Sequence, residues 1–297
     1  MGRAFRRRGA VAAGPSLRVA VTGAGGFVGR HVVAALAARG VDTVAMLRSG
    51  AAAENFPNGV RTVLLDLHAP PDNAHEALGR PDAVVHLAWG GLPHYRAHSH
   101  FDAELPAQYA FLRSLVGAGL RCLVATGTCL EYGLQSGPLP EDGDTHPTTP
   151  YGFAKDALRR QLGFLRAERP FALTWARLFY LHGEGQAPTS LFPLLRTAAE
   201  RGDARFPMSG GEQLRDYLPV TEAAGILAQL AVQGCDAGAV NVCAGRPVSV
   251  RALVERWIAE HGWSVAPDLG RYPYPDYEPL AFWGDRRRLD AALEIAR

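Results

Sequence analysis

Lysine is almost absent from this chain. Among its 31 basic side chains only Lys155 is a lysine, and all the others are arginines. Arginine can replace lysine wherever a surface positive charge suffices, but not where a compact ammonium is required. A solvated lysine on a helix surface is the plain alternative for Lys155. Its place four residues after Tyr151 favours a functional role instead.

Long apolar runs, metal-type cysteine spacing and a strong net charge are also missing. No run approaches the roughly 20 apolar residues that a membrane helix needs. The formal net charge is +2, which is too balanced to indicate nucleic acid as a partner. The four cysteines show no CxxC or CxxH spacing, as in reduced cytoplasmic proteins without a zinc site. We therefore expect a cytoplasmic protein that uses no metal, membrane or nucleic acid.

What the chain does have is the alternation of strands and helices typical of a doubly wound α/β enzyme with a parallel Rossmann sheet. After about residue 180 this alternation gives way to turn-rich stretches around isolated helices, and one late strand, 239–243, is expected to return to the sheet. The expected strands are 17–22, 41–47, 60–65, 83–87, 121–125 and 171–178, and the expected helices are 26–39, 96–119, 149–168, 190–201, 221–233 and 248–261.

These elements divide the chain into an arm and two lobes. Residues 1–15 are predicted to form a flexible basic arm. Residues 16–180, with about 215–245, are predicted to form a dinucleotide-binding Rossmann lobe. The smaller C-terminal substrate lobe is expected from about 181–214 and 246–297.

A glycine-rich loop, TGAGGFVG at 22–29, separates the first strand from its helix. Glycines let the backbone approach a pyrophosphate, and the helix N-terminus offers free N–H groups. Alone such a loop is a plain glycine turn, but between a strand and a helix it predicts a dinucleotide site. The residues expected to contact the cofactor here are Gly23, Gly26, Phe27, Val28 and Gly29.

The end of the second strand bears on the choice of cofactor. An NAD enzyme places an acidic residue there for the ribose 2′-hydroxyl. This chain has Arg48 and Ser49 instead, which suit a 2′-phosphate, and Arg30 could add a second cation. The sequence therefore predicts NADP(H) rather than NAD(H), unless Arg48 is only a solvated strand end. Asp66 and Leu67, after the third strand, are expected beside the adenine.

Tyr151 and Lys155 lie one helical turn apart on the same face of an expected helix. A carbonyl reductase needs a proton donor beside the hydride acceptor, and an unperturbed tyrosine titrates near 10. A nearby ammonium favours the phenolate, so we expect Lys155 to lower the pKa of Tyr151. The lysine could also hold the nicotinamide ribose. A YxxxK pattern alone recurs by chance.

Several motifs occur together in the order found in the extended short-chain dehydrogenases/reductases. The chain resembles this family, the NAD-dependent epimerase/dehydratase family, over about residues 17–290, and within it the nucleotide-sugar ketoreductases that act on dTDP-4-keto-6-deoxyhexoses. The motifs are TGxxGxxG at 22–29, HLA at 86–88, TCLEYG at 128–133, YxxxK at 151–155, RLFYLHG at 177–183 and RDYLPV at 215–220.

The resemblance implies roles for further residues. Thr128 would be the third catalytic residue with Tyr151 and Lys155, and would hydrogen-bond the substrate oxygen. Arg215 matches a basic position that contacts a sugar nucleotide's diphosphate. The other implied contacts are Leu87, Ala88 and Tyr180 with the cofactor, and Trp89 and His94 with the substrate.

Departures from the family pattern narrow the activity. Cys129 and Leu130 stand where dehydratases carry an Asp-Glu pair, which disfavours dehydration. The acid that epimerases place after the second strand is missing. An arginine usual near the C-terminal WxD element is absent from 274–285, and Arg271 is the nearest substitute.

The resemblance thus implies NADPH-dependent reduction of a keto group on a nucleotide-linked deoxysugar, with C4 of a dTDP-4-keto-6-deoxyhexose favoured, in deoxysugar biosynthesis. The partner would be the small-molecule nucleotide sugar, and a homodimer stays open. The alternatives are a nucleotide-sugar epimerase with bound NAD(P), a reductase of small aryl or aldehyde substrates, and, in another class, a non-catalytic NADP(H)-sensing regulator.

Overall fold

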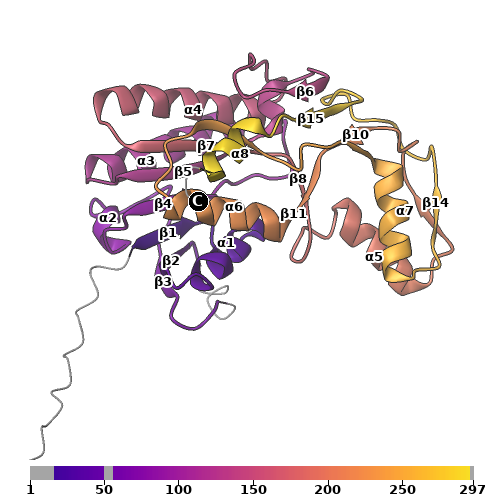
Figure 1. The fold of residues 1–297 in the computed structure, drawn as a ribbon, viewed down its shortest axis with the longest axis horizontal. Helices are drawn as coiled ribbons and strands as arrows, with labels where there is room; N and C mark the ends of the chain where they lie inside the picture. The colour runs from indigo at the N-terminus through magenta and orange to yellow at the C-terminus, as the bar shows by residue number, and fades with distance from the viewer. Residues whose placement is uncertain (1–16, 50–55, 295–297) are drawn as a thin grey trace, which may run out of the picture.

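The computed structural model describes residues 17–49 and 56–294, so the predicted arm at 1–15 lies outside the described residues. Its centre is a seven-stranded sheet in the order β12-β7-β5-β4-β1-β2-β3, with every pairing parallel (Figure 1). The doubly wound α/β fold is therefore confirmed, and the late strand does join the sheet. The strands are β1 Arg18–Thr22, β2 Asp42–Leu47, β3 Arg61–Leu64, β4 Ala83–His86, β5 Cys122–Thr128, β7 Ala172–Leu178 and β12 Gly238–Val242.

Helices cover both faces of the sheet, which explains why its inner strands are apolar on both sides. One apolar core lies between the sheet and the helices α1, α6 and α8, and the other lies beneath α2, α3 and α4 (Figure 1). These helices are α1 Phe27–Ala37, α2 Ala74–Ala77, α3 Leu105–Gly117, α4 Pro150–Glu168, α6 Val220–Val232 and α8 Arg287–Glu294.

The last helix, α8, does not lie in the lobe to which the sequence assigned it. The sequence assigned all of 246–297 to the substrate lobe. In the structure α8 packs against β12 and α6, and Leu289 and Ala292 lie in the same core as the first strand. The apolar face of α8 covers the end of the sheet that β12 forms, so the chain returns to the Rossmann lobe after crossing the smaller one.

The start of α3 is also different from the expected helix over 96–119. The chain first forms a π-helical turn, His100–Glu104, and α3 follows from Leu105. Pro106 sits in the first turn of α3, where its missing N–H leaves no helical bond unmade. This turn carries His100 and Glu104, which lie beside the two cavities described below.

The smaller lobe projects from one end of the sheet (Figure 1). Helices α5 (Leu191–Arg201) and α7 (Val250–His261) pack on each other around a separate apolar core that includes Leu195, Phe206 and Trp257. Four short strand pairs lie outside the seven-stranded sheet: β9 Arg205–Pro207 with β14 Ala266–Asp268, β10 Leu214–Arg215 with β13 Val248–Ser249, β8 Tyr180–His182 with β11 Tyr217–Pro219, and β6 Gly137–Leu139 with β15 Phe282–Gly284. In the described ranges, no helix is both long and apolar enough to cross a membrane.

Candidate active site

Two adjoining cavities lie at the carboxyl end of the sheet, where doubly wound folds bind ligands. The larger, of about 550 Å³, is lined by the glycine loop on one side and by Thr128, Tyr151 and Lys155 on the other. The smaller, of about 430 Å³, continues along the ends of β2 and β3. Both volumes suit small-molecule sites. Gly23, Gly26, Leu87 and Trp89 line both cavities, so the two form one elongated site.

The glycine loop is shaped for close approach of a ligand. Gly23 has a φ of 65°, and a side chain there would come within 2.9 Å of the backbone of Ala88. A side chain at Gly29 would come within 2.1 Å of the carbonyl oxygen of Gly23. The loop can therefore close tightly on the N-terminus of α1, whose free N–H groups suit the pyrophosphate of a dinucleotide. The residues predicted to bind the cofactor here all line the larger cavity: Gly23, Gly26, Phe27, Val28 and Gly29.

The smaller cavity has the residues expected for the adenosine half of a dinucleotide. Arg48 and Ser49 are exposed at its edge, immediately after the buried end of β2. The carboxylate of Glu104, which no motif in the sequence pointed to, is buried beside Gly90 and lies 3.2 Å from Nε2 of His68. Its only signal was its place in the expected helix over 96–119. The other predicted residues that line this cavity are Asp66, Leu67, Leu87 and Ala88.

A buried hydrogen-bond chain fixes the point where β1 and β4 end. The hydroxyl of Thr22 lies 2.9 Å from Nδ1 of His86, and Nε2 of His86 lies 2.7 Å from Oε1 of Gln108. The Thr22 oxygen also accepts hydrogen bonds from the N–H groups of Leu87 and Ala88. Burial lowers the pKa of His86 to about 3, so this ring is a neutral structural link.

Helix α4 holds Tyr151 and Lys155 on one face. Thr149 caps its N-terminus by accepting a hydrogen bond from Gly152 N. Both side chains are buried, and Lys155 is only 2% exposed. The surface alternative for Lys155 is therefore wrong. Its Nζ donates a hydrogen bond of 2.8 Å to the carbonyl oxygen of Thr126 on β5.

The pKa of Tyr151 is shifted in the direction opposite to the one that the sequence predicted. Burial raises the pKa of Tyr151 above the usual value for a phenol, and the hydroxyl of Thr128 opposes this only in part. Burial lowers the pKa of Lys155 to about 7, although Glu131 and Glu104 oppose this. Burial therefore outweighs any effect of Lys155, and the expected fall in the tyrosine pKa is not found. Tyr151 stays protonated near neutral pH and can serve as an acid.

Thr128 ends β5 and is held by the turn that follows it. Its N–H donates to Oε1 of Glu131 at 2.9 Å, and its hydroxyl oxygen accepts from Leu130 N at 3.3 Å. The two contacts form a capping box around the 3₁₀ turn Cys129–Tyr132. Neither contact uses the hydroxyl hydrogen of Thr128, so it is available to donate to a group in the larger cavity, which Thr128 lines. Cys129 and Leu130 also line that cavity.

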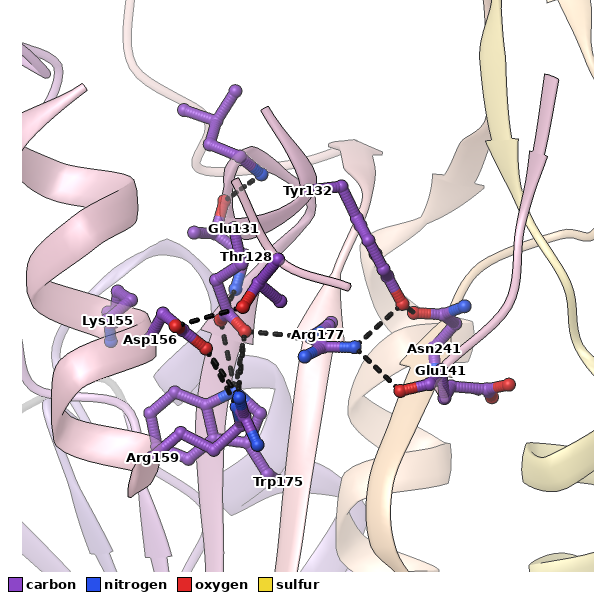
Figure 2. Close-up of polar contacts among 12 residues, drawn as sticks. Thr128, Glu131, Tyr132, Glu141, Lys155, Asp156, Arg159, Trp175, Arg177 and Asn241 are labelled. Carbon is purple, nitrogen blue, oxygen red and sulfur yellow. Dashed lines mark hydrogen bonds and ion pairs between the residues drawn. The ribbon is translucent and has the colours of Figure 1, made fainter. Parts of the chain in front are cut away.

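Glu131 is the centre of a fully buried polar network (Figure 2). Its carboxylate accepts hydrogen bonds from Nε1 of Trp175 at 3.0 Å and from Nε of Arg177 at 2.7 Å. Arg177 also donates to the Tyr132 hydroxyl, which donates in turn to Asn241. Glu131 does not line either cavity, so it supports Thr128 rather than acting as an acid in the site. A buried ion pair of this kind costs much to break.

The loop after β4 contributes to the larger cavity, but not through the histidine that we expected. Trp89 and Tyr95 line the cavity, while the ring of His94 is exposed and does not. The carbonyl oxygen of His94 accepts a hydrogen bond of 3.1 Å from Nε2 of His100. His98 is exposed as well. Within 17–49 and 56–294, no group of three or more His, Cys, Asp or Glu side chains is arranged to hold a metal ion.

Arg215, expected at a diphosphate, is paired with a carboxylate. It is 3% exposed, and its Nη2 lies 3.0 Å from Oε2 of Glu278. Its Nη1 donates to the carbonyl oxygens of Leu214 and Leu280. Glu278 lines the larger cavity, whereas Arg215 lies behind it. Arg271 pairs with Asp268 at 2.7 Å and reaches neither cavity.

Aromatic side chains form the wall of the larger cavity on the side of the smaller lobe. Phe192 and Trp257 meet at 4.9 Å between ring centres, and His182 lies 5.2 Å from Trp257. Tyr180 and Tyr217 continue this wall at 5.2 Å from each other. The hydroxyl of Tyr180 is buried, and among the described residues it has no hydrogen-bond partner. Trp257 thus both packs the lobe core and faces the site.

Several known proteins are similar to this chain in sequence or in fold. The dTDP-6-deoxy-L-talose 4-dehydrogenase (NAD(+)) of Aggregatibacter actinomycetemcomitans is 28% identical over 270 residues, which span 90% of this chain and 99% of that protein. The dTDP-6-deoxy-L-talose 4-dehydrogenase (NAD(P)(+)) of Kitasatospora kifunensis is 29% identical, over 87% of this chain and 83% of that protein.

A solved structure of MoeE5 in complex with UDP-glucuronic acid and NAD superposes with a TM-score of 0.79 and 28% identity, covering 93% of this chain and 92% of MoeE5. Residues 19–243 match the family described as NAD dependent epimerase/dehydratase. That range contains the glycine loop, most of β1, the strands β2 to β7 and β12, and the Thr128–Tyr151–Lys155 group. The chain therefore belongs to the NAD dependent epimerase/dehydratase family.

Proposed function

We propose that this protein catalyses the NADPH-dependent reduction of a keto group on a nucleotide-linked deoxysugar, with C4 of a dTDP-4-keto-6-deoxyhexose as the reacting carbon. The observation that carries the proposal is a single cavity with the glycine loop on one wall and Thr128, Tyr151 and Lys155 on the other. The talose 4-dehydrogenases named above support the substrate class, since a 4-dehydrogenation run in reverse is a 4-keto reduction.

Each side chain of the group has a chemical task. When bound, NADPH would supply the hydride for the carbonyl carbon, and the former carbonyl oxygen would need a proton. Tyr151 is the donor of that proton, because its phenol lines the cavity and is protonated near neutral pH. Thr128 donates a hydrogen bond to the same oxygen, and Lys155 places a positive charge beside the cofactor. The products are the alcohol and the oxidised cofactor.

The test is an assay with NADPH carrying deuterium as the transferred hydride, and a dTDP-4-keto-6-deoxyhexose as substrate. We expect stoichiometric loss of NADPH absorbance and one deuterium atom at C4 of the sugar. UDP-glucose, assayed in parallel, is expected to leave the cofactor unchanged and to give no epimer. Epimer formation without net use of NADPH would assign the protein to the epimerases, and no reaction with either sugar would remove the proposal.

The preference for NADPH rests on Arg48. Replacing Arg48 with alanine or aspartate is expected to weaken NADPH binding by about tenfold or more while changing NADH binding little, because only NADPH carries the 2′-phosphate that a guanidinium binds well. Titration of both cofactors against both variants measures this. Arg196→Ala, at an exposed position on α5, is the control. Equal losses for the two cofactors would refute the assignment of Arg48.

If Arg215 binds the diphosphate of the substrate, substitutions of Arg215 and of its partner Glu278 are expected to change the affinity for dTDP in opposite directions. Glu278→Gln removes the charge that neutralises Arg215, so we expect dTDP to bind several-fold more tightly to this variant than to the unchanged protein. Arg215→Ala is expected to weaken dTDP binding. Calorimetric titration with dTDP measures both. An unchanged affinity in Glu278→Gln would show that the diphosphate is bound elsewhere in the site.

A further inference from the structure

The ammonium of Lys155 has an aromatic neighbour as well as a hydrogen bond. Its Nζ lies 4.1 Å from the centre of the Trp89 ring, and Lys155 is only 2% exposed. A cation over the face of tryptophan is attracted by the negative face of the ring, and more strongly when both groups are desolvated. The carbonyl of Thr126 and the indole of Trp89 thus hold the ammonium together.

Trp89 is itself held in place by a buried histidine. Its Nε1–H donates a hydrogen bond of 3.1 Å to Nδ1 of His100, which is 0% exposed. Since Nδ1 is an acceptor, the other nitrogen, Nε2, carries the hydrogen and donates to the carbonyl oxygen of His94. His100 is therefore hydrogen-bonded at both nitrogens, and its Nδ1 anchors the edge of the indole.

The same cluster contacts the other half of the YxxxK pair. The ring centre of Tyr151 lies 5.3 Å from that of His100 and 6.0 Å from that of Trp89. The charged groups that act on Lys155 from neighbouring elements are Glu131 after β5 and Glu104 on the π-helical turn. The neutral ring of His86 on β4 is the third titratable group nearby, and the charge of Lys155 contributes to the lowered pKa of that ring. Trp89 is thus the side chain in direct contact with the ammonium.

We propose that Trp89, fixed by His100, is a positioning residue for Lys155: the indole face sets where the ammonium lies relative to Tyr151 and the cofactor. From the sequence, Trp89 was expected only to contact the substrate. The new role concerns the position of Lys155. Only its test by turnover rests on the proposed function.

The chain offers a direct probe, because Lys155 is its only lysine. Growth on ¹³C-labelled lysine gives one set of side-chain NMR signals. We expect the Hε protons of Lys155 to be shifted upfield by the indole ring current in the unchanged protein. Trp89→Phe, which keeps an aromatic face, is expected to retain most of this shift, and Trp89→Met to lose it. An unchanged Lys155 signal in Trp89→Met would overturn the proposal.

His100→Phe provides a second variant, should Trp89→Met fold poorly. It keeps a ring but removes the acceptor for Trp89, so the ring-current shift of Lys155 is expected to fall between those of the unchanged protein and Trp89→Met. A shift identical to that of the unchanged protein would show that His100 does not position the indole. These measurements use no sugar, so they remain decisive if the proposed reaction fails.

Turnover separates positioning from substrate contact. Trp89→Met is expected to lower kcat by about tenfold or more with little change in the KM for the keto sugar, and Trp89→Phe is expected to restore most of the loss. A raised KM with unchanged kcat would instead assign Trp89 to substrate binding. Equal losses of kcat in the two variants would show that the aromatic face is not what matters, and would refute the proposal.

Discussion

Replacing Lys155 with arginine is expected to lower turnover by about two orders of magnitude or more, although the charge is conserved. Nζ of Lys155 fits between the carbonyl of Thr126 and the face of Trp89, at 2.8 Å and 4.1 Å. A guanidinium is planar and bulkier, so it cannot take this place without displacing the indole or the cofactor. Excess volume in a packed core costs about 1–3 kcal/mol, so the melting temperature is expected to fall while the fold is kept.

The pH profile provides a second measurement on the same variant. Burial lowers the pKa of Lys155 to about 7, so its positive charge is lost as pH rises through that value. Turnover of the unchanged protein is therefore expected to fall on the alkaline side. Arginine does not titrate in this range, and the residual activity of Lys155→Arg is expected to lack that fall.

Lys155→Met is the matched variant, because it has a similar length and no charge. We expect it to be folded and as inactive as Lys155→Arg. A Lys155→Arg enzyme with near-normal kcat and an unchanged pH profile would show that any cation suffices at this position, and the argument from the single lysine would fail.

Replacing Tyr151 with phenylalanine is expected to lower kcat by about two to four orders of magnitude, which is the usual contribution of a positioned general acid. The ring would still pack against Tyr95 and His100, whose ring centres lie 5.5 Å and 5.3 Å away. Cofactor affinity and the melting temperature are therefore expected to stay close to those of the unchanged protein. Steady-state kinetics, NADPH titration and thermal unfolding measure the three quantities.

Tyr109→Phe, on α3 and away from both cavities, is the control for the loss of a phenolic hydroxyl. It is expected to leave kcat unchanged. Near-normal turnover in Tyr151→Phe would move the proton donor elsewhere, and Thr128 would be the first candidate because its hydroxyl faces the same cavity.

Local patterns predicted most of the elements and the core of the site. The buried strands are apolar runs, and the glycine loop and the YxxxK pair are short motifs whose geometry follows from a tight turn and from one helical turn. A helix also repeats every 3.6 residues whatever surrounds it. For these reasons the positions of Gly23, Tyr151 and Lys155 could be read from the chain alone.

The sequence by itself thus determined a parallel Rossmann sheet, its glycine loop and the Tyr151–Lys155 pair. Only the tertiary structure decided what surrounds them. It buried Lys155 against Trp89, turned His94 outwards, and placed Glu278 on Arg215 from 63 residues away. It also raised the pKa of Tyr151, where the sequence suggested a fall. Such outcomes depend on burial and on contacts between distant segments, since desolvation can outweigh a nearby charge.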